Sequence, residues 1–162
     1  MTSSEIEVRL DALESREAIA RLISDYGHAF DNQDEGLLAS IWHDDARFDL
    51  GEPFGAFTGP DAIVDGARGL WKEVPFQHHW MANVAIDLDG DQATTVTALD
   101  CFVTSLEAGP SMVGGRYLDR FERRDGVWKF VDRKFEMAYF TPVGDWTPMM
   151  GSEADTSDAA AV

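Results

Sequence analysis

The sequence predicts an α+β protein in which N-terminal helices pack on a strongly curved, mixed or antiparallel sheet that encloses a pocket. Apolar residues recur at helical spacing in the chain before Pro75, and they alternate with polar residues after Phe76. The chain has 162 residues, 44% of them hydrophobic, which suits one domain with a real core. Helices first and hairpins afterwards is an α+β order, and long antiparallel strands must twist and curl.

The first helix is expected from Arg16 to about Asp31, with Ser15 as its N-cap. Its apolar side chains follow the i, i+3, i+4, i+7 pattern of one buried helix face. These residues are Ile19, Leu22, Ile23, Tyr26 and Phe30.

Two more helices and a strand are expected before Pro75. Asp34 is a suitable N-cap for a short helix, EGLLASIW, that ends near His43. Residues 46–50 alternate weakly and predict a strand, and the glycines and proline that follow indicate turns. A third helix begins after Gly59 with Pro60 at its first position. Its inward residues are Ile63, Val64, Ala67 and Leu70.

The rest of the chain predicts an antiparallel meander of four strands. Asp89-Gly90 and Asp125-Gly126 are hairpin turn signals, and Ala108-Gly109-Pro110 is a further turn. The strands are longer than average, so we expect bulges or bends in them. They start at Phe76 and then cover about 92–106, 112–124 and 127–140.

Composition excludes several classes of function. The chain has 13 Lys and Arg against 30 Asp and Glu, a formal charge of −17, which would repel a nucleic acid backbone. One cysteine excludes an internal disulfide framework and a multi-cysteine zinc site. The N-terminus lacks an apolar signal core, and no apolar run reaches the length of a membrane span. We therefore expect a cytoplasmic protein with one domain over 1–150 and a flexible acidic tail over 151–162.

Three stretches of sequence resemble a known family. SREAIARLISDYGHAFDNQDEGLLASIWHDDARF, ERRDGVWKF and YFTP are similar to the SnoaL-like family of the nuclear transport factor 2-like, or cystatin-like, cone fold. Within that family they resemble hexachlorocyclohexane dehydrochlorinase, bile-acid dehydratase and scytalone dehydratase. The resemblance covers roughly residues 10 to 142. It implies the cone fold and a homotrimer. The sequence has no serine nucleophile elbow, phosphate loop or dinucleotide fingerprint, so we expect a reaction without metal or other cofactor.

The resemblance also implies a catalytic site. The Asp, His and Arg that the dehydrochlorinase uses fall on Asp31, His79 and Arg133. Five residues before its Asp the dehydrochlorinase has Lys, where this chain has Tyr26, as bile-acid dehydratase does. The change from Lys to Tyr favours a dehydratase-like or other lyase reaction over dehydrochlorination.

Each of these residues has a chemical and a purely structural interpretation. A neutral imidazole is a suitable base at pH 7, and Asp31 could orient it as the carboxylate does in a catalytic triad. Tyr26 could donate a hydrogen bond to a leaving oxygen or an enolate, and Arg133 could bind the departing group. The alternatives are a hydrogen-bonded sheet histidine, a solvated acid, a core tyrosine and an arginine in an ion pair.

The alternation of a strand places His79 and His78 on opposite faces. His79 then shares its face with Gln77, Met81 and Asn83, and His78 lies with Trp80, Val84 and Ile86. Only one of the two histidines therefore faces the pocket, which argues against a metal site here. Cys101 is read as a core residue, and the residues expected to line a substrate pocket are Tyr117, Phe30, Trp42, Phe48, Met81 and Phe135.

The function expected from these observations is β-elimination by a cofactor-independent lyase, with His79 and Asp31 as the base. The substrate is expected to be a small, apolar, cyclic or aromatic molecule. A carbon–carbon lyase that releases formaldehyde, or a double-bond isomerase, would use the same residues. A non-catalytic binding or scaffolding subunit is the alternative of another class. Catalysis requires that Asp31 and His79 meet inside an open cavity.

Overall fold

A computed structural model describes residues 2–144 of the chain, so the tail expected over 151–162 lies outside the described residues. The described part contains three helices and six strands. In chain order they are α1 (Ser3–Asn32), α2 (Glu35–Ser40), β1 (Trp42–Gly51), β2 (Gly55–Thr58), α3 (Pro60–Glu73), β3 (Phe76–Asp89), β4 (Gln92–Ser105), β5 (Gly109–Arg124) and β6 (Val127–Pro142).

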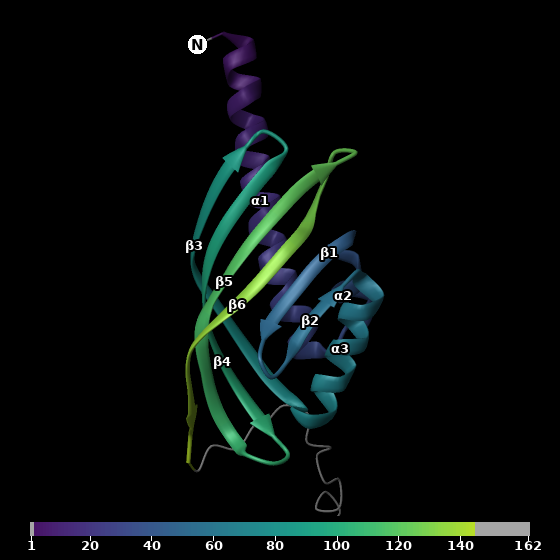
Figure 1. Cartoon of the computed structure of the whole chain (residues 1–162). Helices are drawn as coiled ribbons and strands as arrows, with labels where there is room; N and C mark the ends of the chain where they lie inside the picture. The colour runs from purple at the N-terminus through teal and green to yellow at the C-terminus, as the bar shows by residue number, and fades with distance from the viewer. Residues whose placement is uncertain (1, 145–162) are drawn as a thin grey trace, which may run out of the picture.

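All six strands form one sheet in the order β2-β1-β6-β5-β4-β3. β1 runs parallel to β6, and every other neighbouring pair is antiparallel. Figure 1 shows the sheet strongly curved, with α1 lying along one face and α3 beside β1 and β2. The predicted α+β class and the curved sheet are confirmed. The parallel β1–β6 pair completes a mixed sheet, because β1 joins the edge of the later meander.

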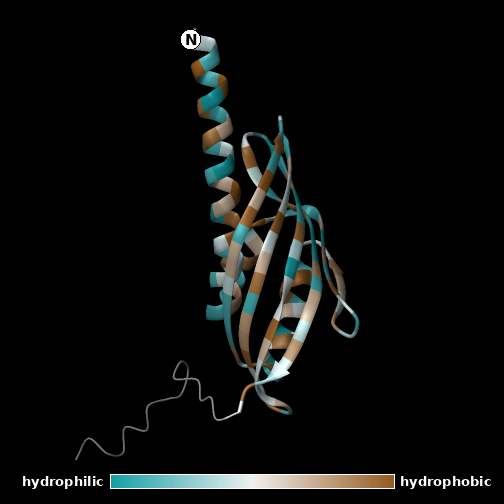
Figure 2. Ribbon diagram, turned by 90° about the vertical axis from the view of Figure 1, so that its left-hand side faces the viewer, coloured by the Kyte–Doolittle hydropathy of each residue, from teal (hydrophilic) through white to brown (hydrophobic). Residues whose placement is uncertain are grey.

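The first helix is longer than the sequence predicted. α1 begins at Ser3, where Thr2 and Glu5 form a capping box, and not at Arg16. Ser15 is therefore no N-cap: it lies inside the helix, 2% exposed, within 3.4 Å of a guanidinium nitrogen of Arg123. Both views show the N-terminal part of α1 extending past the end of the sheet (Figures 1 and 2). The apolar residues of this part, Ile6, Val8, Leu10 and Leu13, are exposed, so they form no buried stripe that could have predicted the helix.

The segment between the long helix and the meander follows the prediction in outline. Asp34 caps α2 by accepting a 2.9 Å hydrogen bond from the Leu37 amide. α2 ends at Ser40, so Trp42 and His43 belong to β1 and not to the helix. The short strand β2, which pairs with β1 at the sheet edge, was not predicted because it has only four residues, begins with Gly55 and is followed by Gly59. α3 starts at Pro60 as expected.

A bulge in β3 changes which residues face inward. Ala82 lies opposite Ala98 and Ala85 lies opposite Val96, so β3 has one residue more than β4 over this interval. Asn83 takes up the extra residue with a φ of 51°. Beyond the bulge Ile86 packs against the core, on the same side as His79, which reverses the face expected for it. Asn83 is exposed and does not share that face.

The coloured bands in Figure 2 show that hydropathy varies from residue to residue along the strands. On β4 every second residue from Ala93 to Cys101 is buried.

Within residues 2–144, no helix is long and apolar enough to cross a membrane.

Candidate active site

A cavity of about 530 Å³ lies between the helices and the curved sheet. Its walls come from α1, α3, the end of β1 with the turn after it, and the four strands of the meander, and most of the lining residues are apolar. Five of the residues predicted for the site line it: Tyr26, Phe30, His79, Tyr117 and Phe135. A cavity of this size suits a molecule of one or two rings.

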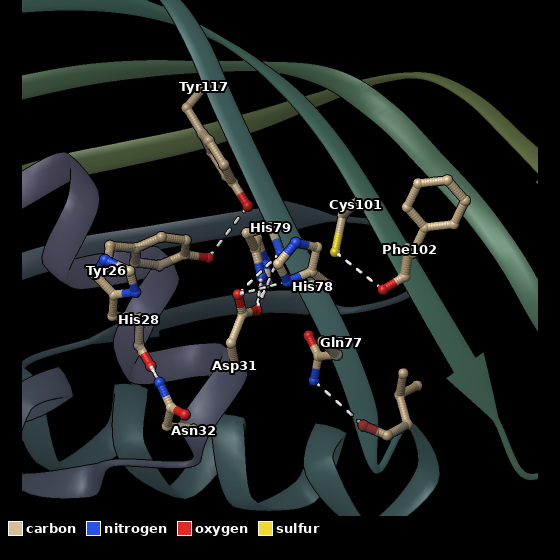
Figure 3. A network of polar contacts seen from close by, with 11 residues as sticks. Tyr26, His28, Asp31, Asn32, Gln77, His78, His79, Cys101, Phe102 and Tyr117 are labelled. Atoms are coloured by element: carbon tan, nitrogen blue, oxygen red, sulfur yellow. Dashed lines mark hydrogen bonds and ion pairs between the residues drawn. The ribbon is translucent and has the colours of Figure 1, made fainter. Parts of the chain in front are cut away.

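Asp31 binds His79 (Figure 3), which lines this cavity, whereas Asp31 itself does not line it. The Nδ1 atom of His79 lies 2.6 Å from Oδ1 of Asp31. The backbone amide of His79 also donates to both carboxylate oxygens, at 3.1 and 3.0 Å. Because an ionised carboxylate only accepts hydrogen bonds, Nδ1 must carry a proton, and Nε2 is the nitrogen that is left for chemistry.

The environment of His79 favours its protonated form. Burial alone would lower the pKa of this imidazole, but negative charge on Cys101 and the Asp31 carboxylate raise it, and the balance is a pKa of about 9. The His79 side chain is only 5% exposed, so solvent screens these interactions little.

His78 points to the other face of β3, as the strand alternation predicted. Its side chain is 61% exposed, and its Nδ1 atom lies 3.8 Å from Oδ2 of Asp31. It does not line the cavity.

Tyr26 and Tyr117 form a pair of phenols beside His79. Their hydroxyl oxygens are 3.2 Å apart, and the ring of Tyr26 meets that of His79 edge-on at 5.9 Å. Burial raises the pKa of both phenols, so both hydroxyls keep their protons. One proton serves the mutual hydrogen bond, and the other can be donated to a ligand.

Arg133 lies behind these two rings and does not line the cavity. Its guanidinium carbon is 4.1 Å from the centroid of Tyr26 and 4.1 Å from that of Tyr117. Two of its nitrogens bind the carboxylate of Asp119 at 2.8 Å, and both side chains are fully buried. The structure thus supports the ion-pair interpretation of Arg133. In this arrangement the guanidinium reaches a bound molecule only through the two tyrosines.

Three further residues expected to line the pocket lie in the core. Trp42 and Phe48 stack on each other at 5.5 Å and are almost completely buried. Met81 packs against Gly27 of α1, where a Cβ atom would come within 2.8 Å of its terminal methyl. Their apolar character alone could not distinguish a core position from a cavity wall.

A model of the SnoaL-like domain matches residues 11–134, which is most of the chain. The chain belongs to the SnoaL-like family. Among its SnoaL-like relatives, hexachlorocyclohexane dehydrochlorinase 1 of Sphingobium indicum is 36% identical over 137 residues, which is 83% of this chain and 88% of the relative. A γ-hexachlorocyclohexane dehydrochlorinase of the same species is also 36% identical to this chain, and the match covers 87% of that relative.

Solved structures agree with this SnoaL-like assignment. A hexachlorocyclohexane dehydrochlorinase from Novosphingobium barchaimii superposes with a TM-score of 0.82 at 33% identity, covering 86% of this chain and 99% of that one. A Nostoc punctiforme protein described as having a cystatin-like fold gives a TM-score of 0.66 at 17% identity, covering 75% of this chain and 90% of that one. The predicted cone fold is therefore confirmed.

One residue of this SnoaL-like site was missed as a candidate. Cys101 lies directly opposite His79 in the β3–β4 pair and lines the cavity, with 3% of its surface exposed. Its thiol makes a 3.7 Å contact with its neighbour's carbonyl oxygen, that of Phe102. The signal that could have found it is the strand register, which depends on the β3 bulge.

Within residues 2–144, no group of three or more His, Cys, Asp or Glu is arranged to hold a metal ion.

Proposed function

We propose that this SnoaL-like protein is a lyase that eliminates water from a small cyclic or aromatic β-hydroxy carbonyl compound, with His79 as the base. The observation that carries the proposal is the 2.6 Å contact between His79 and Asp31 at the wall of an open cavity. A closed or shallow pocket would have favoured a binding or scaffolding subunit.

Asp31 supports the base in two ways. In the neutral ring it keeps the proton on Nδ1, so that Nε2 carries the lone pair, and its charge stabilises the imidazolium that forms when Nε2 takes a proton from carbon. A positioned general base of this kind typically accelerates a reaction by about 10² to 10⁴.

The Tyr26–Tyr117 pair supplies the electrostatic part of the reaction. When a proton leaves the carbon next to a carbonyl group, negative charge develops on the carbonyl oxygen. A phenol hydroxyl aimed at that oxygen stabilises the charge, and its raised pKa keeps it a donor. The Arg133 guanidinium packs against both rings from behind, and its own charge is balanced by Asp119.

The complete step needs only these groups. The C–H bond breaks and its proton goes to Nε2 of His79, while its electron pair forms the enolate. The enolate then expels the β-hydroxyl group, which takes the proton back from the imidazolium and leaves as water. The product is an α,β-unsaturated carbonyl compound.

The leaving group is proposed to be oxygen because of the groups that face the cavity near His79. A departing hydroxide needs a proton, which the imidazolium supplies, whereas a departing chloride is best stabilised by a cation. Arg133 is fully buried in its pair with Asp119, and the chain has a tyrosine at position 26. The relatives are named for dehydrochlorination, so loss of hydrogen chloride is the alternative that the experiment must include.

A test that needs no knowledge of the natural substrate is exchange of the α-protons of cyclic β-hydroxy ketones in D₂O, followed by mass spectrometry. The same samples report elimination by their ultraviolet absorbance. Chlorinated cyclohexanes and diaryl propanediols complete the panel. The variants are His79→Ala and, as a matched control, His28→Ala, which removes an exposed imidazole on α1.

We expect the wild-type protein and the His28→Ala variant to catalyse both exchange and loss of water, and the His79→Ala variant to do neither. Turnover of a chlorinated cyclohexane alone would overturn the choice of leaving group. Release of formaldehyde from a propanediol would indicate carbon–carbon cleavage, and exchange without elimination would indicate an isomerase. Equal exchange by wild-type protein and His79→Ala would overturn the role of the dyad.

A further inference from the structure

Cys101 is a nucleophilic side chain in the cavity for which the elimination described above has no use. It lies on β4 directly opposite His79 of β3. Side chains of directly opposite residues in an antiparallel pair project from the same face of the sheet, with Cβ atoms about 5 Å apart. Both residues line the cavity, so the thiol and the imidazole face the same space.

The thiol of Cys101, which contacts the carbonyl oxygen of Phe102 at 3.7 Å, lies opposite the imidazole that binds the Asp31 carboxylate. Nδ1 of His79 is bound to Asp31, so Nε2 is the ring nitrogen that can accept the thiol proton. Figure 3 shows Cys101 beside the Asp31–His79 contact. The pKa of His79 agrees with this geometry, because negative charge on Cys101 is one of the causes that raise it. An imidazole that holds the proton leaves the sulfur as a thiolate, which is the reactive form of cysteine.

The groups around the sulfur indicate which electrophile it would take. Cys101, Tyr26 and Tyr117 line the same cavity, and negative charge on Cys101 raises the pKa of both phenols. A phenol hydroxyl that donates to a carbonyl oxygen withdraws electrons from a conjugated double bond. The other walls near the sulfur are apolar: Leu99, Val103 and Val113.

We propose that Cys101 is a nucleophile, activated by His79 and Asp31, that adds reversibly to α,β-unsaturated ketones bound in the cavity. The sulfur forms a bond to the β-carbon, and the electrons of the C=C bond move to the carbonyl oxygen, where a tyrosine hydroxyl stabilises the enolate. The thiol proton, held on Nε2 of His79, then goes to the α-carbon. All atoms of the thiol and the ketone remain in the adduct, and no oxidant or reductant takes part.

This inference shares the Asp31–His79 pair with the proposed lyase but requires no elimination. If the lyase also forms such ketones, the addition would act as feedback by its own product. The addition can therefore be tested with a ketone that has no leaving group, and its failure is distinguishable from failure of the lyase.

The experiment uses 2-cyclohexenone and the full chain, which contains one cysteine. The reaction is stopped at intervals with borohydride, which reduces the ketone of the adduct and so prevents the reverse reaction. The adducts are then counted by intact-protein mass spectrometry. At pH 7 a free thiol is only a few per cent thiolate, so a thiolate held by His79 should react about tenfold faster than N-acetylcysteine. The variants are Cys101→Ser, His79→Ala, Asp31→Asn and the control His28→Ala, with circular dichroism to confirm folding.

We expect one adduct per chain on the wild-type protein and on His28→Ala, and none on Cys101→Ser. The rate should fall at least tenfold in His79→Ala and by a smaller factor in Asp31→Asn. A wild-type rate equal to that of His79→Ala would overturn the activation, and an adduct on Cys101→Ser would assign the reaction to another residue. No adduct on the folded wild-type protein, with normal reaction after denaturation, would show an inert buried thiol. If α-proton exchange persists in Cys101→Ser, the lyase proposal stands independently of this result.

Discussion

Asp31 binds His79 through both the backbone and the ring: its carboxylate accepts the amide N–H at 3.0 Å and lies 2.6 Å from Nδ1. One side chain at the end of α1 thus fixes the position of strand β3 and the orientation of its imidazole. Substitution at residue 31 should therefore affect both folding and chemistry, and the two effects differ between variants.

Asp31→Asn should reduce kcat for elimination by about 10² to 10⁴, because an amide oxygen can accept the ring proton but carries no charge to stabilise the imidazolium. The unfolding free energy should change less than in Asp31→Ala, which also leaves the His79 amide without its partner. Steady-state kinetics and urea denaturation of both variants measure the two effects. Unchanged kcat in Asp31→Asn would contradict the orienting role.

The rate of elimination should rise with pH. His79 acts as a base only when neutral, and its pKa of about 9 means that about 1% of the substrate-free protein is competent at pH 7. kcat/KM should increase about tenfold per pH unit up to pH 8 and level off above 9. Removing the charge in Asp31→Asn or Cys101→Ala should move the inflection to lower pH. A flat profile between pH 6 and 9 would show that His79 is neutral throughout.

His79 also links folding stability to pH. Its pKa is raised from 6.5 in the unfolded chain to about 9 in the folded one, a difference worth roughly 3 kcal/mol. This contribution is fully present below pH 6.5 and is lost as the pH rises through 9. Between pH 6 and 10 the unfolding free energy of wild-type protein should therefore fall more steeply than that of His79→Phe, which urea denaturation at each pH measures.

The two phenols should act as one unit. Tyr26→Phe and Tyr117→Phe should each lower kcat about ten- to a hundredfold, and the double variant should lose less than the product of the single losses. A complete double-mutant cycle on kcat measures this coupling. Strictly multiplicative losses would show that the 3.2 Å contact carries no catalytic interaction.

The buried pair of Arg133 and Asp119 should be costly to break and cheap to replace. Asp119→Ala leaves an uncompensated buried guanidinium and should reduce the unfolding free energy by about 3–5 kcal/mol. Replacing both residues, as in Asp119→Leu with Arg133→Met, should recover much of this loss. Because the guanidinium also supports the rings of Tyr26 and Tyr117, the double variant should regain stability without regaining full activity.

The sequence predicted the elements well where local chemistry decides them, as at the Asp34 cap and the Pro60 helix start. It could not predict pairings that depend on a bulge. If β5 and β6 paired regularly from the Asp125-Gly126 turn, Asp119 would lie opposite Asp132. An extra residue near Val131 in β6 instead places Asp119 opposite Arg133. The sequence therefore left open whether Arg133 points to a substrate or to an acid.

The same reasoning explains why Cys101 was missed as a site residue. If β3 and β4 paired regularly from the Gly90 turn, His79 would lie opposite Phe102. The bulge between Ala82 and Ala85 instead places His79 opposite Cys101. The meeting of Asp31 and His79 was implied by resemblance to the family, because a helix end and a strand 48 residues later have no local signal that joins them. The homotrimer expected from the same resemblance stays a prediction.

The N-terminal part of α1 has a consequence for local motion. Residues 3–10 precede the contact of Asp11 with Arg123, which ties the helix to β5, and they extend past the sheet. A helical segment this short is marginal in water without packing, so its helix–coil equilibrium depends on continuity with the packed part of α1 and on the Thr2–Glu5 capping box. Amide protons of residues 6–10 should therefore exchange with solvent through fraying of a few turns, while those around Ile23 should exchange only when the whole domain opens.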